Sequence, residues 1–162
     1  MRIGNPEKSA ALYSFVFVCS GNTCRSPVAE AFARDWVCRN LPDSVNRFSF
    51  ASGGITALEG CAASPNAIEA AHYFDLNLNA HVSRRFTAEL CMGATALTMT
   101  QSQLAVARRV ARFSRCQTLS EWAGYPACDI ADPFMSSLDE YIKCFRQIRD
   151  FVEAGLKRMI RL

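Results

Sequence analysis

A cysteine and an arginine, separated by a short polar loop, are the residues with the clearest chemical potential in this sequence. Cys19 directly follows the apolar run 13–18, and Arg25 comes six positions later. A thiolate is a strong nucleophile, and a guanidinium binds phosphate oxygens through two parallel N–H donors. Ser26 and Pro27 are typical of a helix start. A strand, a tight loop and a helix N-terminus together predict an anion-binding loop that contains its own nucleophile.

The residues of this loop contribute to anion binding mainly through their backbone N–H groups. These groups and the positive end of the helix dipole converge on the centre of the loop, where they also favour the charged form of the thiol. We therefore predict that the binding surface is formed by Ser20, Gly21, Asn22, Thr23 and Cys24.

The string Cys-x5-Arg-Ser-Pro after the first strand resembles the signature of the low-molecular-weight protein tyrosine phosphatases, and the resemblance runs from about Tyr13 to the final helix. The loop sequence, Cys-Ser-Gly-Asn-Thr-Cys-Arg-Ser-Pro, most resembles the bacterial branch that removes phosphate from arginine. Asp132-Pro133 matches the context in which the family carries its acid. The resemblance implies an α/β fold, a three-layer flavodoxin-like structure with a four-stranded parallel sheet flanked by helices.

The resemblance also implies a reaction in two displacements. Cys19 would attack phosphorus and form a phosphocysteine, while Arg25 and the loop N–H groups hold the phosphoryl oxygens. Asp132 would protonate the leaving group and then activate the water that hydrolyses the phosphocysteine. No metal or other cofactor is implied, and the implied substrates are phosphorylated proteins.

Further family positions imply supporting roles for residues around the loop. Asn22 matches an asparagine that adopts a left-handed turn, which asparagine tolerates. Ser26 would both cap the helix and hydrogen-bond the cysteine sulfur, and Ser52 would support the loop by a hydrogen bond. His81 aligns with a histidine of the same network. The resemblance further implies that Cys24 pairs reversibly with the nucleophile as a shelter against over-oxidation.

Thr23 and Phe134 distinguish two substrate classes within the family. Tyrosine-specific members commonly carry isoleucine and tyrosine at these positions, and both residues here match the arginine branch. The variable loop 55–63 has no aromatic residue to stack on a phosphotyrosine ring. We therefore predict a protein-arginine phosphatase, with a protein tyrosine phosphatase as the alternative.

Two alternatives of a different class remain. Thiol-coupled arsenate reductases use a similar loop, but they carry glutamine where Pro27 stands and have resolving cysteines in place of Asp132-Pro133. Cys91 keeps this alternative open. A non-catalytic phosphate-binding module is the other alternative, and it would not need both Cys19 and Asp132.

The composition indicates one ordinary globular domain over residues 1–162, with residues 1–11 as a loose leader. The net charge of 18 − 15 = +3 is too small to indicate nucleic-acid binding. No apolar run reaches the ~18 residues of a membrane span. The eight cysteines are scattered, without metal-ligand spacing, as expected of core fillers in a reducing cytoplasm.

Hydrophobic periodicity predicts alternating strands and helices, which is typical of a parallel α/β sheet. Strands are predicted near 13–18, 47–51, 94–100 and 117–119. Helices are predicted from Pro27 to about 40, and over 65–74, 87–91, 101–111 and 138–159. A long loop over 120–135 would present Asp132 and Phe134.

Overall fold

The computed structural model describes residues 11–161, so most of the predicted leader lies outside the described residues. Its strands are β1 (Tyr13–Cys19), β2 (Phe48–Gly54), β3 (Thr95–Thr98) and β4 (Arg115–Thr118). Its α-helices are α1 (Arg25–Asn40), α2 (Pro65–His72), α3 (Gln101–Val110), α4 (Leu119–Trp122) and α5 (Leu138–Ile160), and a 3₁₀-helix, η1, covers Pro42–Arg47.

The four strands form one parallel sheet in the order β2-β1-β3-β4. β1 is an inner strand, and Val16 pairs with Ala51 of β2 on one side and Ala96 of β3 on the other. Its apolar sequence follows from this position, because an inner parallel strand is covered on both faces. The predicted flavodoxin-like α/β fold is confirmed.

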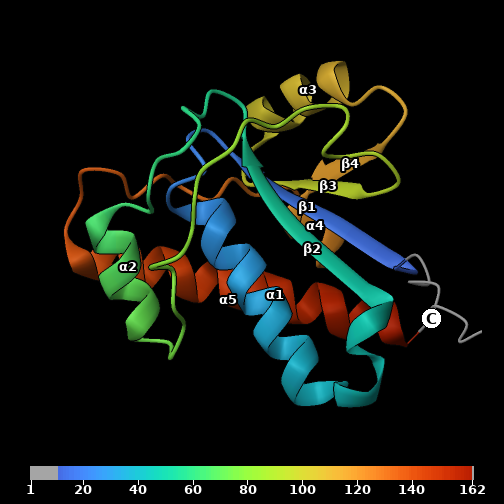
Figure 1. Cartoon of the computed structure of the whole chain (residues 1–162), viewed down its shortest axis with the longest axis horizontal. Helices are drawn as coiled ribbons and strands as arrows, with labels where there is room; N and C mark the ends of the chain where they lie inside the picture. The colour runs from blue at the N-terminus through green and yellow to red at the C-terminus, as the bar shows by residue number, and fades with distance from the viewer. Residues whose placement is uncertain (1–10, 162) are drawn as a thin grey trace, which may run out of the picture.

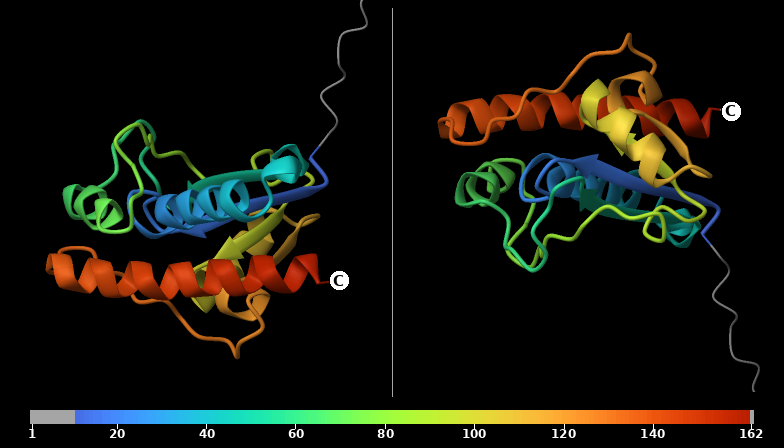
Figure 2. Two further views of the ribbon diagram at one scale, coloured as in Figure 1. Left: turned by 90° about the horizontal axis from the view of Figure 1, so that it is seen from below. Right: turned by 90° about the horizontal axis from the view of Figure 1, so that it is seen from above.

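Helices cover both faces of the sheet and form the outer two of three layers (Figure 1). Side chains alternate along β1, so Phe15 and Phe17 pack into the core shared with α1 and α5. Val16 and Val18 point to the opposite face, where they meet a smaller cluster that includes Ala107 of α3. Figure 2 shows α1 and α5 side by side in one layer, with α3 on the other side of the sheet.

The loops that matter for function gather at one end of the molecule. The segments after β1 and β2 and the loop before α5 lie at the end that also carries α2 (Figures 1 and 2). The start of β1 and the end of α5 lie at the opposite end. Ligands of parallel α/β sheets bind outside the carboxyl ends of the strands, which makes the first of these ends the place to search.

The predicted helix over 87–91 is wrong, since this segment forms successive turns. The Thr87 side chain accepts a hydrogen bond from Leu90 N at 3.2 Å, and Gly93 has a φ of +71°, which stops helical winding. Too few residues remain between them for a stable helix.

The start of the predicted loop 120–135 is also wrong, because the short helix α4 covers its first residues. Thr118 and Glu121 form a capping box: each side chain bonds the backbone N–H of the other residue. The strand before it is correspondingly shifted and ends at Thr118. The pattern Thr-x-x-Glu is the signal that predicts this helix start.

Candidate active site

A pocket of about 330 Å³ opens at the carboxyl-terminal end of β1, and the segment 19–25, here called the phosphate loop, lines it. The predicted residues that line it are Cys19, Ser20, Gly21, Thr23, Cys24, Arg25, Asp132 and Phe134. Thr56, Leu58 and Cys61 complete the wall. The structure thus brings the predicted nucleophile, cation and acid into one pocket, with Asn22 buried in the loop behind them.

The sulfur of Cys19 lies among hydrogen-bonding groups. Asn22 N donates to Cys19 Sγ at 3.3 Å, and Ser26 Oγ is 3.0 Å from the same sulfur. Ser26 Oγ already accepts a hydrogen bond from Asn22 Nδ2 at 2.9 Å. Its single hydrogen is therefore left for either Cys19 Sγ or the Gly53 carbonyl, which is 3.3 Å away. A thiolate would attract that hydrogen and gain a second donor.

Asn22 holds the turn that brings its own N–H to the sulfur. Its φ is +54°, as predicted for the left-handed turn. The side-chain oxygen accepts a bond from Arg84 N at 2.9 Å, so the amide nitrogen must be the end that faces Ser26. The Asn22 carbonyl is 2.7 Å from His81 Nε2. A carbonyl only accepts, which places a hydrogen on that ring nitrogen.

Glycine at the end of β2 allows the phosphate loop to pack closely. A Cβ at Gly54 would lie 2.5 Å from Ser20 O and 2.9 Å from Asn22 N, closer than real Cβ atoms approach backbone. A side chain there would push the loop away from the sheet. The arrangement of the loop N–H groups therefore depends on this position.

Arg25 and Asp132 join the phosphate loop to the loop before α5. Arg25 is buried, and its guanidinium donates to Ile130 O at 2.9 Å and to Asp132 Oδ2 at 2.5 Å. Asp132 Oδ1 accepts a bond from Phe134 N at 3.2 Å. Both carboxylate oxygens of Asp132 therefore accept hydrogen bonds from the protein itself.

Two predicted details of the serines need correction. α1 begins at Arg25 with Cys24 before it, so Ser26 lies inside the first turn and does not cap the helix. Its side chain faces the sulfur instead, as the other half of that prediction required. The Ser52 hydroxyl is buried without a hydrogen-bond partner among residues 11–161. Ser52 pairs with Phe17 in the sheet, and neighbouring side chains share a face, so its hydroxyl lies against the apolar core.

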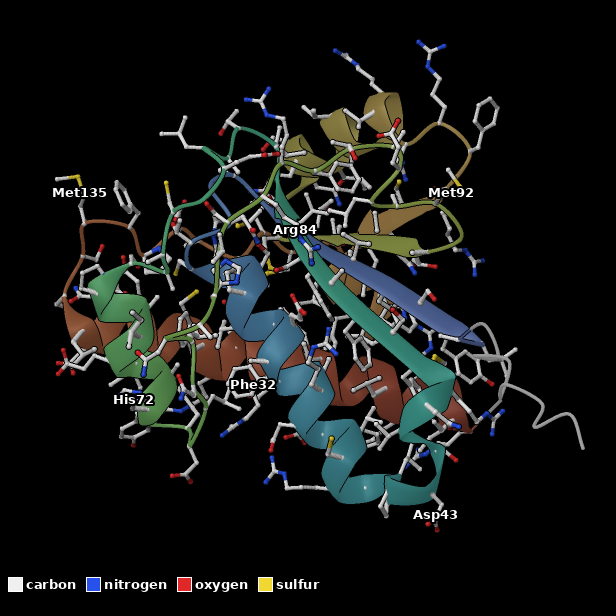
Figure 3. The ribbon with its side chains drawn as sticks, in the orientation of Figure 1. Phe32, Asp43, His72, Arg84, Met92 and Met135 are labelled. Atoms are coloured by element: carbon white, nitrogen blue, oxygen red, sulfur yellow. The ribbon has the colours of Figure 1, made fainter. Side chains whose placement is uncertain are left out.

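Two residues near the loop were not predicted. Arg84 holds Asn22 through its backbone N–H, and its Nε donates to Ser52 O at 2.9 Å. Figure 3 shows Arg84 alongside β2, close to the start of α1. Gln103, in the first turn of α3, donates to Ser20 Oγ at 3.1 Å. Position could have indicated Gln103, because it follows the carboxyl end of β3, whereas Arg84 follows α2 and a long loop and has no such signal.

The second thiol of the phosphate loop, Cys24, has a different pKa from a cysteine at the protein surface. Burial, and then the neighbouring Cys144 and Cys19, raise the pKa of Cys24 well above its usual range. Burial also raises the pKa of Cys144 to about 12. Both side chains are therefore neutral thiols near pH 7, and the cysteines of residues 11–161 are all free.

Neither a metal centre nor a membrane span is found in the part of the chain that the structure describes. No three histidine, cysteine, aspartate or glutamate side chains within residues 11–161 are grouped to hold a metal ion. In the same range, no helix combines the length and apolar character that crossing a bilayer requires.

The sequence profile of the family described as "Low molecular weight phosphotyrosine protein phosphatase" matches residues 14–161. This match covers nearly the whole chain and agrees with the parallel sheet and the loop that follows its first strand. The chain belongs to this family of phosphatases.

Relatives within the family carry two different descriptions. The low molecular weight protein-tyrosine-phosphatase PtpB of Staphylococcus epidermidis is 37% identical over 139 residues, which cover 85% of this chain and 93% of the relative. A protein-arginine-phosphatase of Bacillus subtilis is 36% identical over 149 residues, covering 90% and 93%. Among solved structures, a mutant YwlE arginine phosphatase with a phosphorylated active site serine has a TM-score of 0.80 and 30% identity, covering 90% of this chain and 95% of its own.

Proposed function

We propose that this protein is a protein-arginine phosphatase that works through a phosphocysteine intermediate. The observation that supports arginine over tyrosine as the substrate is the hydroxyl of Thr23 in the wall of the pocket. Thr23 lines the pocket, and none of the hydrogen bonds found within residues 11–161 uses its hydroxyl. Its backbone is fixed separately, because Ser64 N donates to Thr23 O at 2.9 Å. Because the main chain of Thr23 is fixed, its hydroxyl can form a hydrogen bond with the polar, planar guanidinium of phosphoarginine beside the bound phosphoryl group.

In the first displacement, Cys19 Sγ attacks phosphorus as a thiolate. The phosphorus–nitrogen bond of phosphoarginine breaks, and its electron pair stays on the guanidine nitrogen, which takes a proton from Asp132. Negative charge on the phosphoryl oxygens is stabilised by the loop N–H groups and Arg25. The phosphorylated serine in the related YwlE mutant supports covalent transfer to this position of the loop.

The contact between Arg25 and Asp132 must change during this step. Asp132 Oδ2 now accepts from the Arg25 guanidinium, 2.5 Å away, so it is not free to protonate a leaving group. A phosphoryl group offers the same guanidinium a better partner, with two oxygens in bidentate geometry. Substrate binding would therefore release the Asp132 carboxylate, which takes up a proton from solvent and then passes it to the leaving nitrogen.

In the second displacement, water attacks the phosphocysteine and restores the thiolate. Asp132, now a carboxylate, takes a proton from that water. The sulfur leaves with its electron pair, and the Asn22 N–H and Ser26 hydroxyl stabilise the negative charge on it. This step releases inorganic phosphate and regenerates the free Cys19 thiolate.

A tyrosine phosphatase is the second candidate, and the rim of the pocket favours it. Leu58 and Phe134 are 75% and 63% exposed at the pocket, where they could contact the ring of phosphotyrosine. The relationship to PtpB supports the same candidate. The two candidates share the loop chemistry and differ in the wall beside the leaving group.

The arsenate reductase alternative finds little support in the geometry. Those reductases carry their resolving cysteines in a separate segment in place of Asp132-Pro133, and Cys91 is the residue that kept this alternative open. Cys91 is fully buried in the core cluster with α3, and it is not among the residues that line the pocket. The presence of both Cys19 and Asp132 in the pocket likewise argues against a module that only binds phosphate.

Replacing Thr23 with isoleucine tests the choice between the two substrates. Thr23→Ile should lower kcat/KM for a phosphoarginine peptide by about tenfold, because a polar guanidinium N–H loses its partner on desolvation. The same variant should raise kcat/KM for a matched phosphotyrosine peptide, since an aromatic ring prefers an aliphatic wall. Initial rates on both peptides measure the ratio.

Thr23→Ser is the matched control for this test, because it keeps the hydroxyl and should preserve the preference for phosphoarginine. If Thr23→Ile lowered both rates by the same factor, Thr23 would merely support the loop. The assignment to arginine would then lose its main residue-level support.

We also propose that Cys24 protects the nucleophile against oxidation. Because burial raises the pKa of Cys24, Cys19 is the sulfur that peroxide attacks first, forming a sulfenic acid. The Cys24 thiol then attacks the Cys19 sulfur: a sulfur–sulfur bond forms, the sulfur–oxygen bond breaks, and the thiol proton leaves with the hydroxyl as water. External thiols reduce the resulting disulfide. Dithiothreitol should restore most activity to the peroxide-treated wild type and much less to Cys24→Ser. Cys38→Ser, which removes an exposed cysteine of α1, should recover like the wild type. If Cys24→Ser recovered as much activity as the wild type, Cys24 would not be the residue that protects Cys19.

A further inference from the structure

A buried glutamine connects the end of β3 to the phosphate loop. Gln103 lies in the first turn of α3 and is 7% exposed. Its Oε1 accepts a hydrogen bond from Met99 N at 3.1 Å, and its Nε2 donates to Ser20 Oγ at 3.1 Å. One side chain thus joins the main chain after β3 to the residue that follows the nucleophile.

The direction of these two hydrogen bonds follows from the chemistry of the groups. A backbone N–H only donates, so the end of Gln103 that faces Met99 must be the oxygen. The other end is then the NH₂ group, which only donates, and Ser20 Oγ must be the acceptor. A hydroxyl that accepts one hydrogen bond keeps its own hydrogen for another partner.

The described residues offer that hydrogen no acceptor. Ser20 lines the pocket, and its hydroxyl donates to no protein atom among residues 11–161. The backbone of Ser20 is held independently, since Thr56 N donates to Ser20 O at 3.0 Å. The hydroxyl is therefore turned by Gln103 on a fixed main chain.

We propose that Gln103 is a positioning residue that holds the Ser20 hydroxyl as a hydrogen-bond donor to the bound phosphoryl group. Without Gln103, the hydroxyl could turn its lone pairs toward the phosphoryl oxygens and repel them. With Gln103, the pocket has one more donor, already oriented, where negative charge collects. The proposal rests on the proposed function to the extent that the pocket binds a phosphoryl group. It is the same for phosphoarginine and phosphotyrosine.

Orthovanadate binding and nitrophenyl phosphate turnover by the full chain test this proposal. Gln103→Met keeps the length of the side chain and removes its donor and its acceptor. It should raise the Kd for vanadate and lower kcat/KM by about five- to tenfold, the cost of one misdirected hydrogen bond. Ser20→Ala should have a similar effect. In the Ser20→Ala background, Gln103→Met should change the Kd by less than about twofold, because the two residues act through one hydroxyl.

Gln101→Met is the matched control, since Gln101 is exposed in the same turn of α3 and should leave vanadate binding unchanged. An equal effect of Gln103→Met in both backgrounds would show a structural role and overturn the proposal. An unchanged Kd in Ser20→Ala would also overturn it.

If Gln103→Met does not fold, Ser20→Thr and Ser20→Ala decide the matter. Threonine keeps the hydroxyl, so Ser20→Thr should weaken vanadate binding less than Ser20→Ala does, and equal weakening by the two substitutions would refute the proposal. Failure of the proposed function looks different. A wild type that hydrolyses neither phosphopeptide would refute the function, while the vanadate comparison among variants would still test Gln103.

Discussion

Cys19→Ser should reduce turnover of every phosphorylated substrate by about 10⁴-fold or more, the scale seen when a covalent nucleophile is removed. A serine hydroxyl is a far weaker nucleophile than a thiolate near pH 7, and the donors around it were arranged for a negative sulfur. Phosphate and vanadate should still bind, because Arg25 and the backbone N–H groups of the loop remain. Initial rates and vanadate binding on the same preparation measure both effects.

Cys38→Ser provides the control for this substitution, because Cys38 is an exposed thiol on α1 outside the pocket. It should retain the wild-type rate. Turnover by Cys19→Ser near the wild-type rate would remove Cys19 from the mechanism. Loss of vanadate binding together with turnover would instead indicate that the substitution disrupts the loop.

The phosphate loop could be predicted from sequence because its chemistry is local. Cys19, Arg25 and the strand and helix that flank them lie in one continuous stretch, so spacing alone indicates an anion site. Asp132 is 107 residues from Arg25, and no local pattern joins them. Only the family resemblance placed them together, and the ion pair agrees with it.

The errors at Ser52 and Gln103 have a common cause, which is the direction of individual side chains. Ser52 was expected to bond the loop, but its register opposite Phe17 turns its hydroxyl to the apolar face. Gln103 was missed because an amide in the first turn of a helix has no distinctive residue pattern. Its role depends on which atom faces Met99, and that is a property of tertiary structure.

Asp132→Ala should slow the phosphorylation step with phosphoarginine by about 10²–10⁴-fold, the usual contribution of a general acid. A guanidine leaves poorly without a proton, whereas nitrophenolate leaves with little help, so nitrophenyl phosphate should be slowed far less. Single-turnover kinetics on both substrates isolate this step. Equal slowing of the two would argue against the acid role. Asp129→Ala is a control from the same loop, because Asp129 contacts Gln101 N and does not line the pocket.

The ion pair with Arg25 predicts an opposite effect of Asp132→Ala on binding. In the wild type, phosphate must displace the Asp132 carboxylate from the Arg25 guanidinium, which is 2.5 Å away. Removing the carboxylate leaves Arg25 free and takes a negative charge from the pocket, so the Kd for inorganic phosphate should fall while kcat falls. Asp132→Asn also removes the general acid, but its amide oxygen can still accept a hydrogen bond from Arg25. Its Kd for inorganic phosphate should therefore lie between the values of the wild type and Asp132→Ala. A higher Kd in Asp132→Ala would mean that Asp132 positions Arg25 for phosphate and does not compete with it.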